Sequence, residues 1–137
     1  MIKTIVEPRI RREFLPQISL LDLENYHLDH PQNWQRIAEQ RPEFYTVISR
    51  GNNVLGYSLV LPLRREAYES LRAGKIGDFE LQPRDISDDP AGFYVASVAA
   101  SRQIRNRFPL LCGVLVGLVG AQTIRASKEV IAMSRTH

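Results

Sequence analysis

Residues 93–107 read FYVASVAASRQIRNR, and this stretch decides how the whole chain is interpreted. Its first part, Phe93–Ala100, is apolar almost throughout, which is typical of a strand covered on both faces of its sheet. The part that follows, residues 101–107, is polar and basic and predicts a loop. The uncharged run Phe108–Ile124 is too long for a strand, and its apolar part is too short for a membrane span, so we expect a buried helix there.

Prolines, glycines and apolar spacing divide the rest of the chain into short elements. Pro16 suits the first turn of a helix, Gly74 suits a helix end, and the residues 51–53 suit the turn of an antiparallel hairpin. The order of elements predicts a mixed α/β (α+β) domain. We expect helices over residues 15–26, 31–40 and 63–73, strands over 44–49, 54–61 and 130–133, and a loop over 82–92.

Length and composition indicate one globular domain. The chain has 137 residues, of which 44% are hydrophobic and 24% charged, so a single core over residues 1–137 is expected and disorder is not. The only cysteine, Cys112, excludes an internal disulfide. The first residues lack the basic and apolar pattern of a signal peptide. We therefore expect a cytoplasmic protein.

The positive charge gathers at one end of the chain. Residues 1–100 hold 12 basic and 14 acidic side chains, whereas residues 101–137 hold 6 basic ones and a single acid. This asymmetry indicates an anionic partner near Arg102, Arg105 and Arg107, and a solvated turn is the plainer interpretation. Because no nucleic-acid-binding signature is present, we expect a phosphate-bearing small molecule and no nucleic acid.

Two further patterns carry weak signals. His27-Leu28-Asp29-His30 offers three side chains for a metal or for acid–base chemistry, but nothing identifies the further ligand that a metal needs, so we expect no metal. Gly113 and Gly117 form one G-x-x-x-G, which occurs where membrane helices pair but also where backbones approach closely in soluble proteins. We favour the second interpretation and expect no membrane partner.

The strand, basic loop and helix together resemble the GNAT superfamily of N-acyltransferases. The signature of that family is a strand ending in small apolar residues, a Q/R-x-x-G-x-G/A loop, and a helix. Here residues 97–100 match the strand end and residues 105–110 have the spacing of the loop. The segments 14–18 and 54–57 also resemble earlier elements of the family, so the similarity covers roughly residues 10–133. It implies a GNAT-like fold with a central mixed sheet flanked by helices.

The resemblance implies that the chain binds acetyl-CoA or a longer acyl-CoA as co-substrate. Backbone N–H groups at a loop that enters a helix bind anions, so they would hold the pyrophosphate with help from nearby arginines. The strand would offer its backbone to the pantetheine arm, and one N–H would stabilise the oxyanion formed at the thioester. The cofactor-binding residues implied in this way are Val98, Ala99, Ala100, Arg105, Asn106, Arg107, Phe108 and Leu110.

The chain departs from the family pattern in two ways. Phe108 and Leu110 stand where the loop normally has glycines, so we expect them to crowd the helix start and weaken pyrophosphate binding. Only 13 residues follow Ile124, so we expect the later strands and helix of the family to be absent. No tyrosine follows Tyr94, although a tyrosine of that later part often protonates the departing thiolate in the family.

The catalytic candidates therefore come from the earlier part of the chain. Glu80 precedes an acidic loop and is a candidate general base for the amine, although a solvated carboxylate at a strand edge is the commoner role of such a residue. Tyr94 and Ser97 lie on the central strand and are candidates for substrate binding or proton relay. For Tyr94, a place in the core is the commoner alternative.

Three functions are consistent with these features. The first is an acyl-CoA-dependent N-acyltransferase that moves an acyl group from a thioester to a small-molecule or peptide amine. The second is a GNAT-like protein without catalysis that binds or regulates. The third is an enzyme similar to the N-acyl amino acid and acyl-homoserine lactone synthases, which take the acyl group from an acyl carrier protein.

The short C-terminal part also predicts self-association. A family-like domain that ends near Met133 is expected to leave a central strand with an unpaired edge and an apolar helix partly uncovered. Exposed edges and apolar patches favour pairing with another chain, and a symmetric dimer is the commonest closed arrangement. We therefore expect a homodimer.

Overall fold

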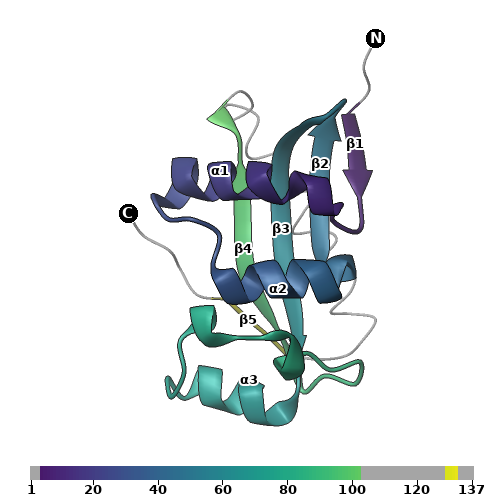
Figure 1. Cartoon of the computed structure of the whole chain (residues 1–137). Helices are drawn as coiled ribbons and strands as arrows, with labels where there is room; N and C mark the ends of the chain where they lie inside the picture. The colour runs from purple at the N-terminus through teal and green to yellow at the C-terminus, as the bar shows by residue number, and fades with distance from the viewer. Residues whose placement is uncertain (1–3, 103–128, 133–137) are drawn as a thin grey trace.

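The computed structural model describes residues 4–102 and 129–132, and within them it has one five-stranded sheet with three α-helices (Figure 1). The strand order is β1-β2-β3-β4-β5; the first four strands pair antiparallel, and β5 pairs parallel to β4. The expected mixed α+β class with a central mixed sheet is confirmed. The elements are β1 (Thr4–Glu7), α1 (Leu15–Tyr26), α2 (Gln32–Gln40), β2 (Tyr45–Arg50), β3 (Asn53–Leu63), α3 (Arg65–Arg72), β4 (Gly92–Ala100) and β5 (Glu129–Ala132).

Helices α1 and α2 cross the same face of the sheet, and local sequence sets their ends (Figure 1). Pro16 lies in the first turn of α1, where its missing N–H removes no helical bond. His27 ends α1 in the left-handed region, at φ 59°, and donates its N–H to Leu23 O at 3.0 Å. Pro31 precedes α2 and Pro42 follows it, as the sequence predicted to within one residue.

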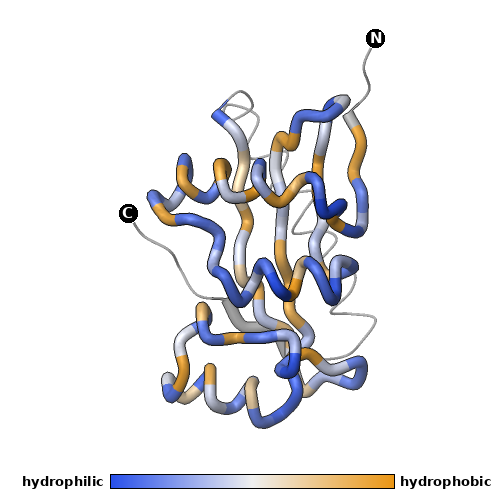
Figure 2. Tube along the Cα trace, in the orientation of Figure 1, coloured by the Kyte–Doolittle hydropathy of each residue, from blue (hydrophilic) through white to orange (hydrophobic). Residues whose placement is uncertain are grey.

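The buried side of α1 and α2 packs on β2, β3 and β4 to form the main core. Figure 2 shows hydrophilic residues along α2 and along its connection to α1, whereas β3 is largely neutral to hydrophobic. Every residue of β3 after Asn53 is buried, which agrees with its place in the middle of the sheet. The largest fully buried side chains are Trp34, Tyr45, Tyr57, Tyr94, Ile18, Ile37, Ile48, Leu59, Leu61, Leu63 and Leu81.

One predicted boundary is wrong. We expected a strand to end before Pro62 and a helix to begin at Leu63, but β3 continues through Leu63 and α3 begins at Arg65. The strand tolerates Pro62 because β2 pairs with β3 only as far as Leu59. Beyond that point the neighbour is a loop whose Ser87 donates its N–H to the carbonyl of Pro62 at 3.0 Å, so the missing N–H of the proline breaks no ladder.

Strand β4 has two neighbours and one irregularity. It pairs with β3 along its length, but Leu59 faces Ser97 whereas Val60 faces Val95, so Ala96 is an extra residue that forms a bulge. Its pairing with β5 covers residues 92–95. The predicted last strand is thus confirmed, and the expectation that β4 lacks a partner on this edge is wrong for residues 92–95, because β5 lies beside them.

Gly92 opens β4 against the ring of Tyr68 in α3, and we expect Gly92→Ala to lower the free energy of unfolding by about 1–3 kcal/mol. A Cβ at Gly92 would overlap Cε1, Cζ and Cδ1 of that ring. Gly77→Ala is the matched control, because a Cβ there meets only Glu80 Oε2 at 3.5 Å and φ is −86°. Urea unfolding of both variants measures the difference; equal stabilities would contradict the close packing of Gly92.

Candidate functional site

The edge of β4 beyond the bulge meets the end of α1. Ser101 donates its N–H to Leu55 O at 2.8 Å, so the alternation of the strand turns the backbone groups of Val98 and Ala100 away from β3. The Tyr26 hydroxyl donates to Val98 O, and Asn25 Nδ2 donates to Ala100 O at 2.9 Å. At these two positions, side chains of α1 bond the strand carbonyls.

Behind this edge lies a buried chain of polar side chains from α1, the α1–α2 connection and three strands. Asp22 and His30 are each 1% exposed, and His30 Nδ1 lies 2.7 Å from Asp22 Oδ2. His30 Nε2 lies 2.6 Å from the Tyr45 hydroxyl. The other oxygen of Asp22 bonds the Tyr57 hydroxyl, which also lies 2.9 Å from Ser97 Oγ. The chain therefore runs from His30, next to α2, to Ser97 on β4.

The hydrogen atoms shared in this buried polar network can be counted from its donors and acceptors. Tyr45 has one hydroxyl hydrogen and lies 2.9 Å from Trp34 O, a carbonyl that can only accept, so His30 supplies the hydrogen on its bond to Tyr45. An ionised Asp22 accepts from both His30 and Tyr57, and Ser97 then donates to Tyr57. The count places two hydrogens on His30, or one of them on Asp22, so the pair is neutral as a whole.

The two tyrosines of this buried polar network, Tyr45 and Tyr57, are held as neutral phenols. Burial raises the pKa of Tyr45 well above 10.0, and the negative charge of Asp22 acts in the same direction. The pKa of Tyr57 is raised in the same way, first by burial and then by Asp22. Both hydroxyls thus serve as hydrogen-bond donors, and neither is a general base.

The structure places the predicted residues Tyr94 and Ser97 on one face of the sheet. Residues three apart in a regular strand point to opposite faces, but the extra residue Ala96 restores them to the same side. Tyr94 is fully buried and donates its hydroxyl to Asp78 Oδ2 at 2.7 Å. Ser97 is also buried, at the end of the polar chain.

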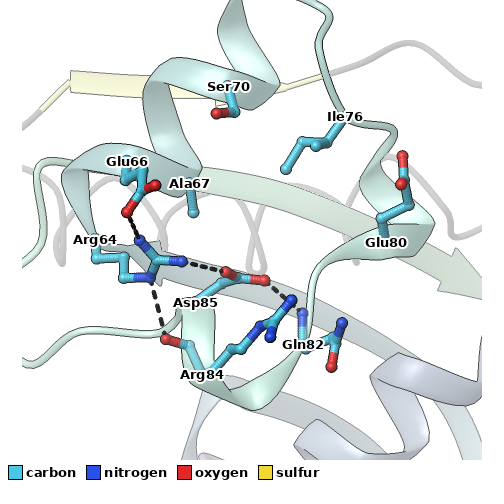
Figure 3. A pocket seen from close by; sticks show the side chains of 9 residues that line it. All are labelled: Arg64, Glu66, Ala67, Ser70, Ile76, Glu80, Gln82, Arg84 and Asp85. Carbon is cyan, nitrogen blue, oxygen red and sulfur yellow. Dashed lines mark hydrogen bonds and ion pairs between the residues drawn. The ribbon is translucent and has the colours of Figure 1, made fainter.

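Glu80 lies apart from these two residues, in a short turn after α3. It is exposed, and its Oε2 accepts the N–H of Gly77 at 2.6 Å. It lines a pocket of about 250 Å³, where Figure 3 shows it across from Arg64. Arg64 bonds Glu66 Oε2 at 2.7 Å and Asp85 Oδ1 at 3.1 Å. The pocket also includes Ala67, Ser70, Ile76, Gln82 and Arg84.

The structure describes only part of the predicted cofactor site. Val98, Ala99 and Ala100 form the end of β4, and Ala99 and Ala100 are buried. Arg102 pairs its Nε with Glu24 Oε1 at 3.2 Å, so α1 already offsets its charge. The other five predicted residues lie outside the described residues, as does the expected helix 108–124; they are Arg105, Asn106, Arg107, Phe108 and Leu110.

The buried polar network was not predicted from the sequence, although one signal for it exists. Asp22 follows Ile18 and Leu21 on the apolar side of α1, where a carboxylate needs a partner. His30 belongs to the pattern considered for a metal, but its ring is bonded to Asp22 and Tyr45. Within residues 4–102 and 129–132, no group of three or more His, Cys, Asp or Glu side chains is placed to hold a metal ion.

Comparison with known proteins identifies the fold. No protein-family model matches the chain, and no curated protein is significantly similar to it in sequence. Among solved structures it matches the loading GNATL domain of CurA from Lyngbya majuscula, with a TM-score of 0.68 and 10% sequence identity. The fold is GNAT-like. The match covers 96% of this chain and 65% of the other, so the chain spans about two thirds of the length of that structure.

The described helices were compared with the length and hydropathy that a membrane span needs. None of those in the described part of the chain is long and apolar enough to cross a membrane.

Proposed function

We propose that the chain is a GNAT-type acyltransferase that transfers an acyl group from acetyl-CoA or a longer acyl-CoA to an amine. The observation that supports this most is the edge of β4 beyond the bulge at Ala96, where Val98 and Ala100 turn their backbone groups away from β3. An extended arm with amide groups binds such an edge as an added strand does. The edge leads into the arginines at 105 and 107, which are suited to phosphates.

The proposed reaction is a single acyl transfer. The amine nitrogen attacks the thioester carbonyl carbon, and a backbone N–H stabilises the resulting oxyanion. The C–S bond then breaks, the amine loses a proton, and the thiolate gains one. Ser97 is the proposed relay for a proton, because its hydroxyl is joined through Tyr57 to the Asp22–His30 pair. Glu80 remains the proposed base and Tyr94 a proposed substrate-binding group.

Calorimetric titration with acetyl-CoA and octanoyl-CoA tests the proposal. We expect dissociation constants of micromolar order, and at least about tenfold weaker binding after joint Arg105→Ala and Arg107→Ala substitution. Joint Arg9→Ala and Arg12→Ala is the matched control, since both of these arginines are exposed on the N-terminal segment. An unchanged affinity in the first variant would mean that the basic segment is a solvated turn.

A second candidate, a GNAT-like binding protein without catalysis, is favoured by α1. Because Tyr26 and Asn25 already bond the carbonyls of Val98 and Ala100, an acyl donor must share or displace them. This candidate predicts no binding of acyl-CoA to the native chain and some binding to Tyr26→Phe. Transfer from an acylated carrier protein, with none from acyl-CoA, would instead support the carrier-dependent synthase.

The setting of the reaction and the assembly state are also proposals. The single cysteine suits the cytoplasm, where we place the reaction. A homodimer remains our prediction, and it now depends on the apolar run 108–124 rather than on the edge of β4 that β5 covers. Sedimentation at several concentrations measures it, and a chain that stays monomeric at high concentration would contradict it.

A further inference from the structure

A cavity of about 460 Å³ opens where α1 passes into α2, which is within the size range of small-molecule sites. Three segments form it: the connection after α1, the first turn of α2, and the short turn after α3. Its lining residues are Leu28, Asp29, His30, Pro31, Gln32, Gln35 and Phe79.

Asp29 is the acidic side chain among the residues that line the cavity. Asp29 is exposed, and it makes no ion pair with any residue in the described part of the chain. His30 also lines the cavity, but both of its ring nitrogens are bonded inside the core, to Asp22 and Tyr45. The N-terminus of α2 adds a partial positive charge of roughly half a unit, which the full charge of Asp29 outweighs. The cavity therefore favours a cation.

Two apolar side chains, Leu28 and Phe79, also line the cavity. Leu28 is 51% exposed and Phe79 is 40% exposed, so both offer apolar surface to a ligand. The Phe79 ring packs edge-on against Trp34, with centroids 5.3 Å apart, and Asn33 Nδ2 donates to Phe79 O at 3.1 Å. A ligand for this wall has an apolar body, and an aromatic face also attracts a cation.

One residue of the cavity belongs to the buried polar network. His30 is joined to Ser97 through Asp22 and Tyr57. We propose that this cavity binds a primary amine with an apolar body and no carboxylate, whose ammonium group faces Asp29. This binding does not depend on the proposed function.

The fluorescence of Trp34 reports occupancy, because it is the only tryptophan and packs against Phe79. The probes are hexylamine, hexan-1-ol and hexanoate, which share a chain and differ in charge. We expect a saturable change with hexylamine, about threefold weaker binding of hexan-1-ol, and still weaker binding of hexanoate. Binding of hexanoate as tight as that of hexylamine, or no saturable change with hexylamine, would overturn the proposal.

Single substitutions separate the contribution of the Asp29 charge to ligand affinity from that of apolar contact. Asp29→Asn is expected to weaken hexylamine about threefold and to leave hexan-1-ol unchanged. Asp89→Asn is the matched control, because it makes the same change in net charge at an exposed position that does not line the cavity. Leu28→Ala is expected to weaken both ligands by the same severalfold factor. An equal loss of hexylamine affinity in the two aspartate variants would overturn the site.

The outcome is separable from that of the acyl-donor titration. Amine binding at Trp34 without any acyl-CoA binding would refute the proposed acyl-CoA-dependent activity and leave the cavity assigned. Acyl-CoA binding without amine binding would refute the cavity assignment alone.

Discussion

Replacement of Asp22 by alanine is expected to lower the free energy of unfolding by about 3–5 kcal/mol, as for other buried pairs that lose one partner. Asp22 is 1% exposed and accepts hydrogen bonds from His30 and Tyr57. Without its carboxylate, these two buried donors would have no acceptor. Its loss affects three elements at once, because His30 lies next to α2 and Tyr57 lies on β3. Urea unfolding, followed by circular dichroism, measures the change.

Asp88→Ala is the matched control for this substitution. Asp88 Oδ1 also takes part in a close ion pair, at 2.7 Å from Arg41 Nη2, but its side chain is 88% exposed. Exposed pairs contribute little, so we expect a loss below about 1 kcal/mol. A loss in Asp22→Ala no larger than in Asp88→Ala would mean that the buried pair does not hold α1 to the sheet.

Local sequence predicted the helices and the hairpin because short-range rules set their ends. Pro16 and Pro42 act through their rings on the nearest turn, whatever the rest of the chain does. Gly74 adopts φ 74° just after α3, as a residue without a Cβ can do readily. Pro62 misled the prediction because its tolerance in β3 depends on where β2 stops pairing, which is a tertiary fact.

The candidate site was less predictable because it depends on register and on distant partners. A single extra residue, Ala96, brings Tyr94 and Ser97 to one face, and no composition rule marks that position. Asp22 and Tyr57 are 35 residues apart in sequence yet share a hydrogen bond. Glu80 was chosen for its place before an acidic loop, and the structure shows it accepting the N–H of Gly77 in its own turn.

A second large effect is expected above pH 10, where the free energy of unfolding should fall by up to about 2.7 kcal/mol per pH unit. Burial, and then the charge of Asp22, raises the pKa of Tyr45 and Tyr57 well above 10.0 in the folded chain. The unfolded chain loses both protons near pH 10, whereas the folded chain keeps them. Stability is therefore complete below pH 10 and is lost as the pH rises toward the folded values. Urea unfolding at pH 9, 10 and 11 measures the slope.

Tyr45→Phe isolates the contribution of Tyr45 to the pH dependence of the free energy of unfolding. It removes one of the two protons, so its slope should be shallower than that of the native chain by up to about 1.4 kcal/mol per pH unit. Tyr57→Phe is a poorer choice, because it would leave one oxygen of Asp22 without its donor. Other tyrosines and lysines that titrate in this range contribute equally to both slopes and cancel in the difference. The slope counts protons, so it is independent of the stability that the variant loses at neutral pH. Equal slopes would therefore mean that Tyr45 ionises as readily in the folded protein as in the unfolded one. That result would contradict the burial of Tyr45 in the polar network.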